Sequence, residues 1–290
     1  MTTVTMEDKI YSSPVFTLTE HDYIQDALVL MQTNFIKRVI IIKGRKPVGI
    51  VTERDINRFL ERDSTKRALD EIPLKEIMKK NLITVTEGQQ DHLDQCAIRM
   101  ETFEIGSIII INADGDLVGI TTQTDIAKFY AKSYSGKYKV KDCMTDRVFT
   151  CRHSDSLKFA LEMISKNNTS RLIVTDNDGN VKGVITTNTF LTNSSYFKKP
   201  IKTREYLLPN KSSSEVTVGD RMKDEVLMIE PDDDLATAAH LMIRNDVSGI
   251  PVIVMKNNKL VGVVTKFDIV RAFAHVLPHA KLLDKYKTFH

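Results

Sequence analysis

Short apolar runs with the length of β-strands recur along the chain, and each follows a segment whose apolar residues have helical spacing. The runs read "RVIIIK" (38–43), "SIIIIN" (107–112), "RLIVTD" (171–176) and "IPVIVM" (250–255). They are rich in the β-branched residues that favour strands. Before the first run, Ile24, Leu28 and Met31 fall on one face of a helix. The pattern therefore predicts a helix followed by a buried strand, four times over.

A turn and a second strand follow each run. The turns read "GRKP" (44–47), "ADGD" (113–116), "NDGN" (177–180) and "NNK" (257–259), with glycine or asparagine available for positive φ, which is a hairpin signal. The second strand ends in a shared phrase: "GIVTERD" (49–55), "GITTQTD" (119–125), "GVITTNT" (183–189) and "GVVTKFD" (262–268). A helix begins after it. With a short strand such as "VFTL" (15–18) in front, each repeat has the order β-α-β-β-α, and the fold class is α/β.

The shared threonine marks the period of the repeat. Thr52, Thr122, Thr186 and Thr265 are 70, 64 and 79 positions apart. We divide the chain into repeat 1 (1–63), repeat 2 (72–133), repeat 3 (138–195), a connector (196–216), repeat 4 (217–277) and a C-terminal tail (278–290). A unit of about 60 residues buries too little apolar surface to be stable alone. Repeats 1 and 2 are therefore expected to form one module, and repeats 3 and 4 another.

Composition narrows the class of protein. A net charge of +3 over 290 residues does not by itself indicate nucleic-acid binding, which requires clustered positive charge. No apolar run approaches the roughly 20 residues of a membrane-spanning helix. The N-terminal residues have no secretory pattern, and the three cysteines form no CxxC pair. We expect a cytoplasmic protein with free thiols and no membrane association.

The threonine and the acid of the shared phrase allow two interpretations. In the first, Thr52 caps the helix and Asp55 reaches back to the backbone of the cap. In the second, the free N–H groups at the start of the helix favour a phosphate. The carboxylate then accepts from the hydroxyls of a ribose, as acidic residues do in dinucleotide folds. One copy leaves the two interpretations about equal, whereas the repetition favours a site for a nucleoside phosphate.

The β-α-β-β-α unit and the G-h-h-T-x-x-D ending, together with an opening at Met78, Met144 or Met222, resemble the cystathionine-β-synthase (CBS) domain. Repeat 1 has the same opening pattern, but it begins at Tyr11 and not at a methionine. The resemblance covers nearly the whole chain in four copies and implies two pseudo-twofold Bateman modules. The plan is similar to that of the nucleotide-sensing γ subunit of AMP-activated protein kinase.

The resemblance implies a non-catalytic regulatory protein with an adenine nucleotide (AMP, ADP or ATP) as its regulatory ligand, bound in clefts between paired repeats. A homodimer is implied as well, together with a protein partner that the sequence does not identify. An alternative is a scaffold with closed clefts that acts through protein or nucleic-acid contacts. Another adenosyl ligand, such as S-adenosylmethionine, is a further alternative.

The resemblance also implies roles for individual residues. Ribose and the adjoining phosphate are expected at Thr52 with Asp55, Thr122 with Asp125, and Thr265 with Asp268. The adenine is expected against Ile83 and Ile105 in the Asp55 cleft, Phe16 and Ile36 in the Asp125 cleft, and Phe149 and Thr169 in the Asp268 cleft. Basic groups for the phosphates are Lys37, Arg38 and Arg171. Core packing explains each wall residue equally well, and a surface position at a strand start explains each arginine.

Repeat 3 departs from the pattern because Thr189 stands where the other repeats have aspartate. A threonine does not provide the acceptor pair that a ribose diol requires. The cleft of this repeat, walled by Leu227 and Val247, is therefore expected to be empty or to bind differently. At most three working sites are predicted.

No catalytic or metal site is expected from the motifs. Walker, GxGxxG, HExxH and GxSxG motifs are absent from the sequence. The "DNDGN" stretch (176–180) lacks the glutamate of a calcium loop and is more typical of a hairpin turn. His275 and His279 are separated by Pro278 and have no third ligand. The connector stretch "YFKKPIKTREY" (196–206) mixes aromatic and basic residues, which permits contact with single-stranded nucleic acid, although a solvated connector is the commoner case.

Overall fold

The computed structural model describes residues 11–63, 65, 67–88, 91–192 and 216–276. The tail predicted at 278–290, and the connector predicted at 196–216 apart from its last residue, lie outside the described residues. Within them, each repeat builds one small sheet with helices packed on it, so the predicted α/β class is confirmed.

The strands follow the repeated pattern. They are β1 (Thr17–Leu18), β2 (Arg38–Lys43) and β3 (Lys46–Thr52) in repeat 1; β4 (Thr84–Thr86), β5 (Ser107–Ile111) and β6 (Leu117–Thr122) in repeat 2; β7 (Thr150–Arg152), β8 (Arg171–Thr175) and β9 (Val181–Thr186) in repeat 3; and β10 (Gly249–Val254) and β11 (Lys259–Thr265) in repeat 4.

The helices lie between and after these strands. They are α1 (Ile24–Thr33) and α2 (Glu53–Arg62); α3 (His92–Thr102) and α4 (Gln123–Ser133); α5 (Val140–Cys143), α6 (Leu157–Lys166) and α7 (Thr187–Thr192); and α8 (Leu235–Arg244) and α9 (Lys266–Val276). Short 3-10 helices cover Leu69–Glu71, Leu74–Glu76 and Met255–Asn257.

In repeats 1 to 3 the first strand runs parallel to the second, and the second pairs antiparallel with the third. Repeat 4 keeps only the hairpin β10–β11, and its first strand is reduced to a parallel bridge between Ile229 and Val252. The reason is local. In repeat 3, the N–H of Ile173 donates to the carbonyl of Phe149 (3.0 Å). Pro251 occupies the equivalent position in β10, and proline has no N–H to donate.

The opening residue of each repeat packs on the glycine of the shared phrase in its partner. A methyl group added to Gly49 would lie 2.6 Å from the sulfur of Met78, and one added to Gly262 would lie 2.7 Å from the sulfur of Met144. A methyl group added to Gly183 would likewise lie 2.5 Å from the sulfur of Met222. Tyr11 lies against Gly119 in the same way. These reciprocal contacts join repeat 1 to repeat 2 and repeat 3 to repeat 4, which confirms the predicted modules.

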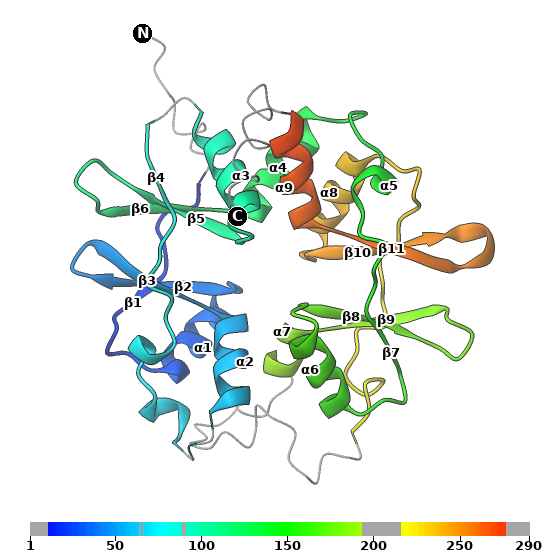
Figure 1. The fold of residues 1–290 in the computed structure, drawn as a ribbon, viewed down its shortest axis with the longest axis horizontal. Helices are drawn as coiled ribbons and strands as arrows, with labels where there is room; N and C mark the ends of the chain where they lie inside the picture. The colour runs from blue at the N-terminus through cyan, green and yellow to red at the C-terminus, as the bar shows by residue number, and fades with distance from the viewer. Residues whose placement is uncertain (1–10, 64, 66, 89–90, 193–215, 277–290) are drawn as a thin grey trace.

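Figure 1 shows the two modules side by side, with repeat 2 facing repeat 4 and repeat 1 facing repeat 3. The joint between repeats 2 and 4 is apolar: α4 packs on α8 and α9, and their buried residues form one core. Phe129 and Tyr134 of repeat 2 make edge contacts with Phe273 of repeat 4, at centroid distances of 5.5 and 5.6 Å. The cores of repeats 1 and 3 remain separate clusters.

The joint between repeats 1 and 3 lies where α2 meets α7, and hydrogen bonds between described side chains cross it. Asn188 donates to the Oε1 atom of Glu53 (2.9 Å), and Arg58 donates to the Oδ1 atom of Asn168 (2.9 Å). Among the described side chains the module contact is therefore asymmetric, because one end is held by apolar burial and the other by these hydrogen bonds.

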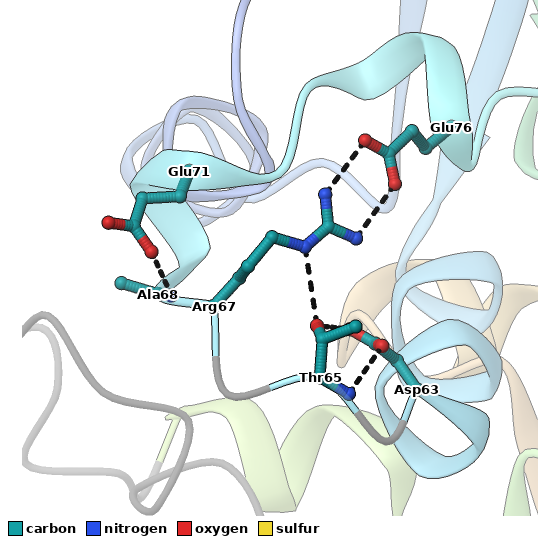
Figure 2. Close-up of polar contacts among 6 residues, drawn as sticks. All are labelled: Asp63, Thr65, Arg67, Ala68, Glu71 and Glu76. Atoms are coloured by element: carbon teal, nitrogen blue, oxygen red, sulfur yellow. Dashed lines mark hydrogen bonds and ion pairs between the residues drawn. The ribbon is translucent and has the colours of Figure 1, made fainter.

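In the segment that connects α2 to repeat 2, the side chain of Arg67 forms three hydrogen bonds. Figure 2 shows Arg67 donating two parallel hydrogen bonds to the carboxylate of Glu76 (2.8 and 2.9 Å) and one to the hydroxyl of Thr65 (3.2 Å). Bidentate arginine–carboxylate pairs have a defined geometry, so this contact orients the chain as it leaves α2. Among the described residues, no helix is long and apolar enough to cross a membrane.

Candidate functional site

The threonine and the acid of the shared phrase bond to each other at the start of the closing helix. In repeat 1, the backbone N–H and the hydroxyl of Thr52 both donate to Oδ2 of Asp55 (3.0 and 2.6 Å). The N–H of Asp55 donates back to the threonine hydroxyl (3.2 Å). The capping interpretation is thus correct in its geometry. It uses a single carboxylate oxygen, however, and leaves Oδ1 available for another role.

The other acidic repeats have the same geometry. Thr122 donates to Oδ2 of Asp125 from its N–H (2.8 Å) and hydroxyl (2.7 Å). Thr265 donates likewise to Asp268 (2.7 and 2.6 Å). In repeat 3 the hydroxyl of Thr189 accepts from the N–H of Thr186 (3.1 Å). A hydroxyl therefore replaces the carboxylate of the cap, and repeat 3 lacks the second charged oxygen.

The second oxygen has a different environment in each acidic repeat. Oδ1 of Asp55 forms an ion pair with Lys79 at 2.8 Å. Oδ1 of Asp268 forms an ion pair with Arg271, one turn further along α9. No described side chain forms an ion pair with Asp125, which is also less buried than the other two acids. Lys79 and Arg271 are contacts that the sequence analysis did not predict, because neither residue belongs to the shared phrase.

Each module has one arginine between its paired repeats. Arg38 begins β2 and extends over Gly106 of repeat 2, where an added methyl group would lie 3.2 Å from both terminal nitrogens. Arg171 begins β8 and extends over Gly249 of repeat 4, and it donates to the hydroxyl of Ser248 (2.8 Å). The glycines leave room for the guanidinium groups because they lack a side chain.

The pKa values of Arg38 and Arg171 are affected by burial and by the nearby acids. Burial lowers the pKa of Arg38, while Glu53, Asp125 and Asp55 oppose that change. Burial lowers the pKa of Arg171 to about 10, with Asp268 opposing it. Arg38 therefore faces both carboxylates of the first module, whereas Arg171 faces the one carboxylate of the second. Both side chains are charged at neutral pH, because a guanidinium group is effectively always protonated in proteins.

Further charges gather where the modules meet. Lys266 is 5% exposed and donates from Nζ to the hydroxyl of Thr124 in repeat 2 (3.1 Å). Burial lowers its pKa to about 8, and repulsion from Lys37 adds to the change. Burial also lowers the pKa of Lys37, which Glu53 opposes, and burial raises the pKa of Glu53 itself. Lys37 is one of the phosphate-binding residues predicted from the sequence, whereas Lys266 and Glu53 were not predicted. Both directly follow the shared threonine, so the charge at that position was the available signal.

The predicted adenine walls occupy equivalent places in the fold. The N–H groups of Ile36, Ile105 and Thr169 each donate to a carbonyl of the preceding helix, at 2.9, 3.0 and 3.1 Å. Val247, the predicted wall of the cleft without an acid, does the same at 3.0 Å. The sequence correctly identified these positions as equivalent, although their contact with a base stays a prediction.

The wall residues on the first strands differ in exposure. Phe16 is 42% exposed, which leaves its ring accessible. Ile83 packs on the core shared by repeats 2 and 4, as does Leu227, the other predicted wall of the cleft without an acid. Phe149 packs on the core of repeat 3, and the guanidinium of Arg147 lies 5.4 Å from the centre of its ring. Of the ring faces predicted to stack on adenine, that of Phe16 is the more accessible.

The described residues contain no group of three or more His, Cys, Asp or Glu side chains that could hold a metal ion. Burial raises the pKa of Cys96 and Cys151 to about 12 and that of Cys143 to about 11. These cysteines are therefore thiols, not nucleophilic thiolates, at neutral pH. A cavity of about 280 Å³ near the hairpin ends of the first module includes none of the predicted site residues.

Comparison with known proteins agrees with this architecture. A family model of the CBS domain matches residues 7–62, 74–132, 140–195 and 218–275. Protein MJ1225 of Methanocaldococcus jannaschii is 27% identical over 267 residues, which cover 87% of this chain and 92% of MJ1225. Its crystal structure, described as that of a candidate archaeal homologue of g-AMPK, superposes with a TM-score of 0.78 at 26% identity and covers 92% of this chain and 99% of its own.

Two further relatives bear on the repeat structure. A CBS domain-containing protein of Dictyostelium discoideum is 35% identical over 144 residues, or 49% of this chain and 94% of that protein. A conserved protein of Pyrococcus horikoshii shares the fold, with a TM-score of 0.63 at 21% identity, over 91% of this chain and 97% of its own. The four-repeat arrangement thus recurs over whole chains, and half of this chain matches a whole shorter relative.

Proposed function

This chain belongs to the CBS domain family, and on that premise we propose that it is a non-catalytic regulatory protein that binds adenine nucleotides in the clefts between paired repeats. The observation that carries the proposal is the position of the acid. In three repeats a buried or half-buried aspartate uses Oδ2 for its cap, so that its Oδ1 atom is outside the cap and, among the described residues, is bonded only to a side-chain cation at Asp55 and Asp268. A carboxylate oxygen in that position suits the hydroxyls of a ribose.

The surroundings of the acids suit a phosphate. The acids lie at the starts of α2, α4 and α9, where the helix dipole favours negative charge. Arg38 or Arg171 lies between the repeats of each module, and a guanidinium binds phosphate oxygens in a bidentate manner. Lys37 and Lys266 add positive charge where the modules meet. We propose that this charge sets the preference among AMP, ADP and ATP.

We propose that binding acts by a shift between arrangements of the modules. A ligand that contacts two repeats favours the arrangement in which both contacts are made. The joint between repeats 1 and 3 is the part that we propose to change, since its described side chains are joined by hydrogen bonds and the cores of the two repeats are separate clusters. A protein partner would then bind the altered surface with a different affinity. The homodimer implied by the resemblance stays a prediction.

A scaffold with closed clefts is the second candidate. Asp55 and Asp268 are already ion-paired with Lys79 and Arg271, which is the arrangement that a permanently closed cleft would have. In that case the protein acts through its surface alone. S-adenosylmethionine remains an alternative ligand for an open cleft, because it has the same ribose and adenine.

Calorimetric titration with AMP, ADP, ATP and S-adenosylmethionine distinguishes these possibilities. Asp55→Ala, Asp125→Ala and Asp268→Ala are each expected to remove one binding site. Thr189→Ala is the matched control, because it changes the same position of the phrase in the repeat that lacks the acid. If no adenosyl compound produces heat or raises the melting temperature, the scaffold interpretation replaces the binding one.

A further inference from the structure

One position of the fold differs among the four clefts although the backbone around it is the same. The residue after the opening residue of each repeat forms a two-hydrogen-bond antiparallel bridge with the residue two positions before the partner's shared threonine. These pairs have N···O distances of 2.9 to 3.1 Å and are Ser12 with Ile120, Lys79 with Ile50, Thr145 with Val263, and Lys223 with Val184. Serine, lysine, threonine and lysine therefore occupy equivalent places next to the four caps.

The lysine of this position contacts the acid in the first cleft. Nζ of Lys79 lies 2.8 Å from Oδ1 of Asp55, the oxygen that Thr52 does not use. The Asp55 side chain is 6% exposed, whereas that of Lys79 is 58% exposed, so the ammonium covers the carboxylate from the solvent side. At the Asp125 cleft the equivalent residue is Ser12, and no described cation is ion-paired with that acid.

The ion pair between Lys79 and Asp55 means that a ligand entering the Asp55 cleft encounters a paired carboxylate, whereas a ligand entering the Asp125 cleft does not. A ribose hydroxyl that approaches Oδ1 of Asp55 has to replace the ammonium, whereas no such replacement is needed at Asp125. An ion pair with an exposed lysine changes an equilibrium by about fivefold at most. Asp268 has a cation of its own in Arg271. Among the described side chains, ion pairs hold Asp55 and Asp268 but not Asp125, so a sugar has no described ion pair to break at Asp125.

We propose that Lys79 is a specificity-determining residue that competes with the ribose for Oδ1 of Asp55, so that the Asp125 cleft fills before the Asp55 cleft. The proposal rests on the proposed function, because it concerns the order in which nucleoside sites fill. It adds that the shared phrase does not by itself set the affinity of a cleft. The residue after the opening residue of the partner repeat also contributes.

The test uses full-length chains that keep a single acid, with AMP and adenosine as probes in calorimetric titrations. Asp125→Ala combined with Asp268→Ala leaves the Asp55 cleft, and Lys79→Met is then added. Adenosine has no phosphate that the displaced ammonium of Lys79 could bind, so its affinity reports on the sugar and the base without a phosphate contact. Lys79→Met is expected to raise the affinity for adenosine about fivefold. Lys80→Met is the matched control, since Lys80 is an adjacent exposed lysine without this contact.

The reciprocal variant places the lysine in the other cleft. In a chain with Asp55→Ala and Asp268→Ala, Ser12→Lys is expected to lower the adenosine affinity of the Asp125 cleft by a similar factor. If AMP binds but Lys79→Met leaves the adenosine affinity unchanged or lower, the competition does not exist and only this inference fails. If neither AMP nor adenosine binds any single-acid chain with an unchanged melting temperature, the proposed function fails and the inference with it.

Discussion

Arg171 of repeat 3 donates a hydrogen bond of 2.8 Å to the hydroxyl of Ser248 in repeat 4, and its guanidinium lies directly over Gly249. Arg171 and Gly249 occupy the same position in their repeats, since each begins its strand opposite the shared threonine. A contact between equivalent positions lies at the pseudo-twofold axis of the module. There is room for one arginine at that axis, and the partner repeat accordingly has glycine.

This arrangement predicts that Arg171→Gln weakens phosphate binding in the Asp268 cleft. The substitution removes the charge that faces Asp268 but keeps a hydrogen-bonding group near Ser248. In a chain with Asp55→Ala and Asp125→Ala, the affinity for AMP is expected to fall by about 10- to 100-fold, because a charge-assisted hydrogen bond is worth about 1.5–3 kcal/mol. The affinity for adenosine is expected to change little. Titrations with the two ligands check this, and Arg38→Gln in the same chain serves as the control.

The packing of the opening residues predicts a specific coupling within the first module. Alanine at position 49 would place its methyl group 2.6 Å from the sulfur of Met78, so Gly49→Ala is expected to destabilise the protein by about 1–3 kcal/mol. Met78→Ala removes the atoms that clash. The double variant should therefore lose less stability than the sum of the two single variants, as measured by urea unfolding. Strict additivity would contradict the proposed contact.

The buried lysine between the modules predicts a pH effect on stability. The pKa of Lys266 falls from 10.5 to about 8 on folding, chiefly through burial. Between pH 8 and pH 10.5 the unfolded chain therefore binds more protons than the folded one, so stability from this group rises with pH across that window. At pH 7 the buried charge is unfavourable, and Lys266→Met is expected to stabilise the fold by about 3 kcal/mol at most.

Urea unfolding at pH 7 and pH 9.5 measures this effect. The gain from Lys266→Met should be smaller at the higher pH, where the wild-type lysine is mostly neutral. Lys132→Met is a suitable comparison because Lys132 is exposed on the facing repeat. A Lys266→Met variant that is less stable than wild type at pH 7 would show that the hydrogen bond to Thr124 outweighs the cost of burial.

The asymmetric joint predicts that the two ends of the module contact differ in strength. Phe273 is fully buried between repeats 2 and 4, and Phe273→Ala is expected to cost about 3–5 kcal/mol. Arg58→Ala removes an exposed hydrogen bond between repeats 1 and 3 and is expected to cost less than about 1 kcal/mol. In native-state hydrogen exchange, amides of α2 and α7 should exchange before those of α4 and α9. The reverse order would argue against an opening joint between repeats 1 and 3.

Local patterns predicted the elements well. The periodicity of Ile24, Leu28 and Met31 predicted α1, and the threonine of the shared phrase predicted where the closing helices begin. These features depend on residues close in sequence, so the chain itself specifies them. The first strand of repeat 4 is where the pattern was wrong. Pro251 removes a donor that the other repeats use, and this effect is visible only when the strands are aligned across repeats.

The amino-acid sequence by itself determined that this chain has four α/β repeats, two modules and three acids at equivalent helix starts. Each of these follows from spacing within one repeat or from identity among repeats. Only the tertiary structure decided which charge meets each acid. Lys79 reaches Asp55 from the next repeat, Arg38 and Arg171 cross a module axis, and Lys266 crosses between modules. Their side chains act across distances in sequence that no local pattern encodes, because packing of the repeats brings them together.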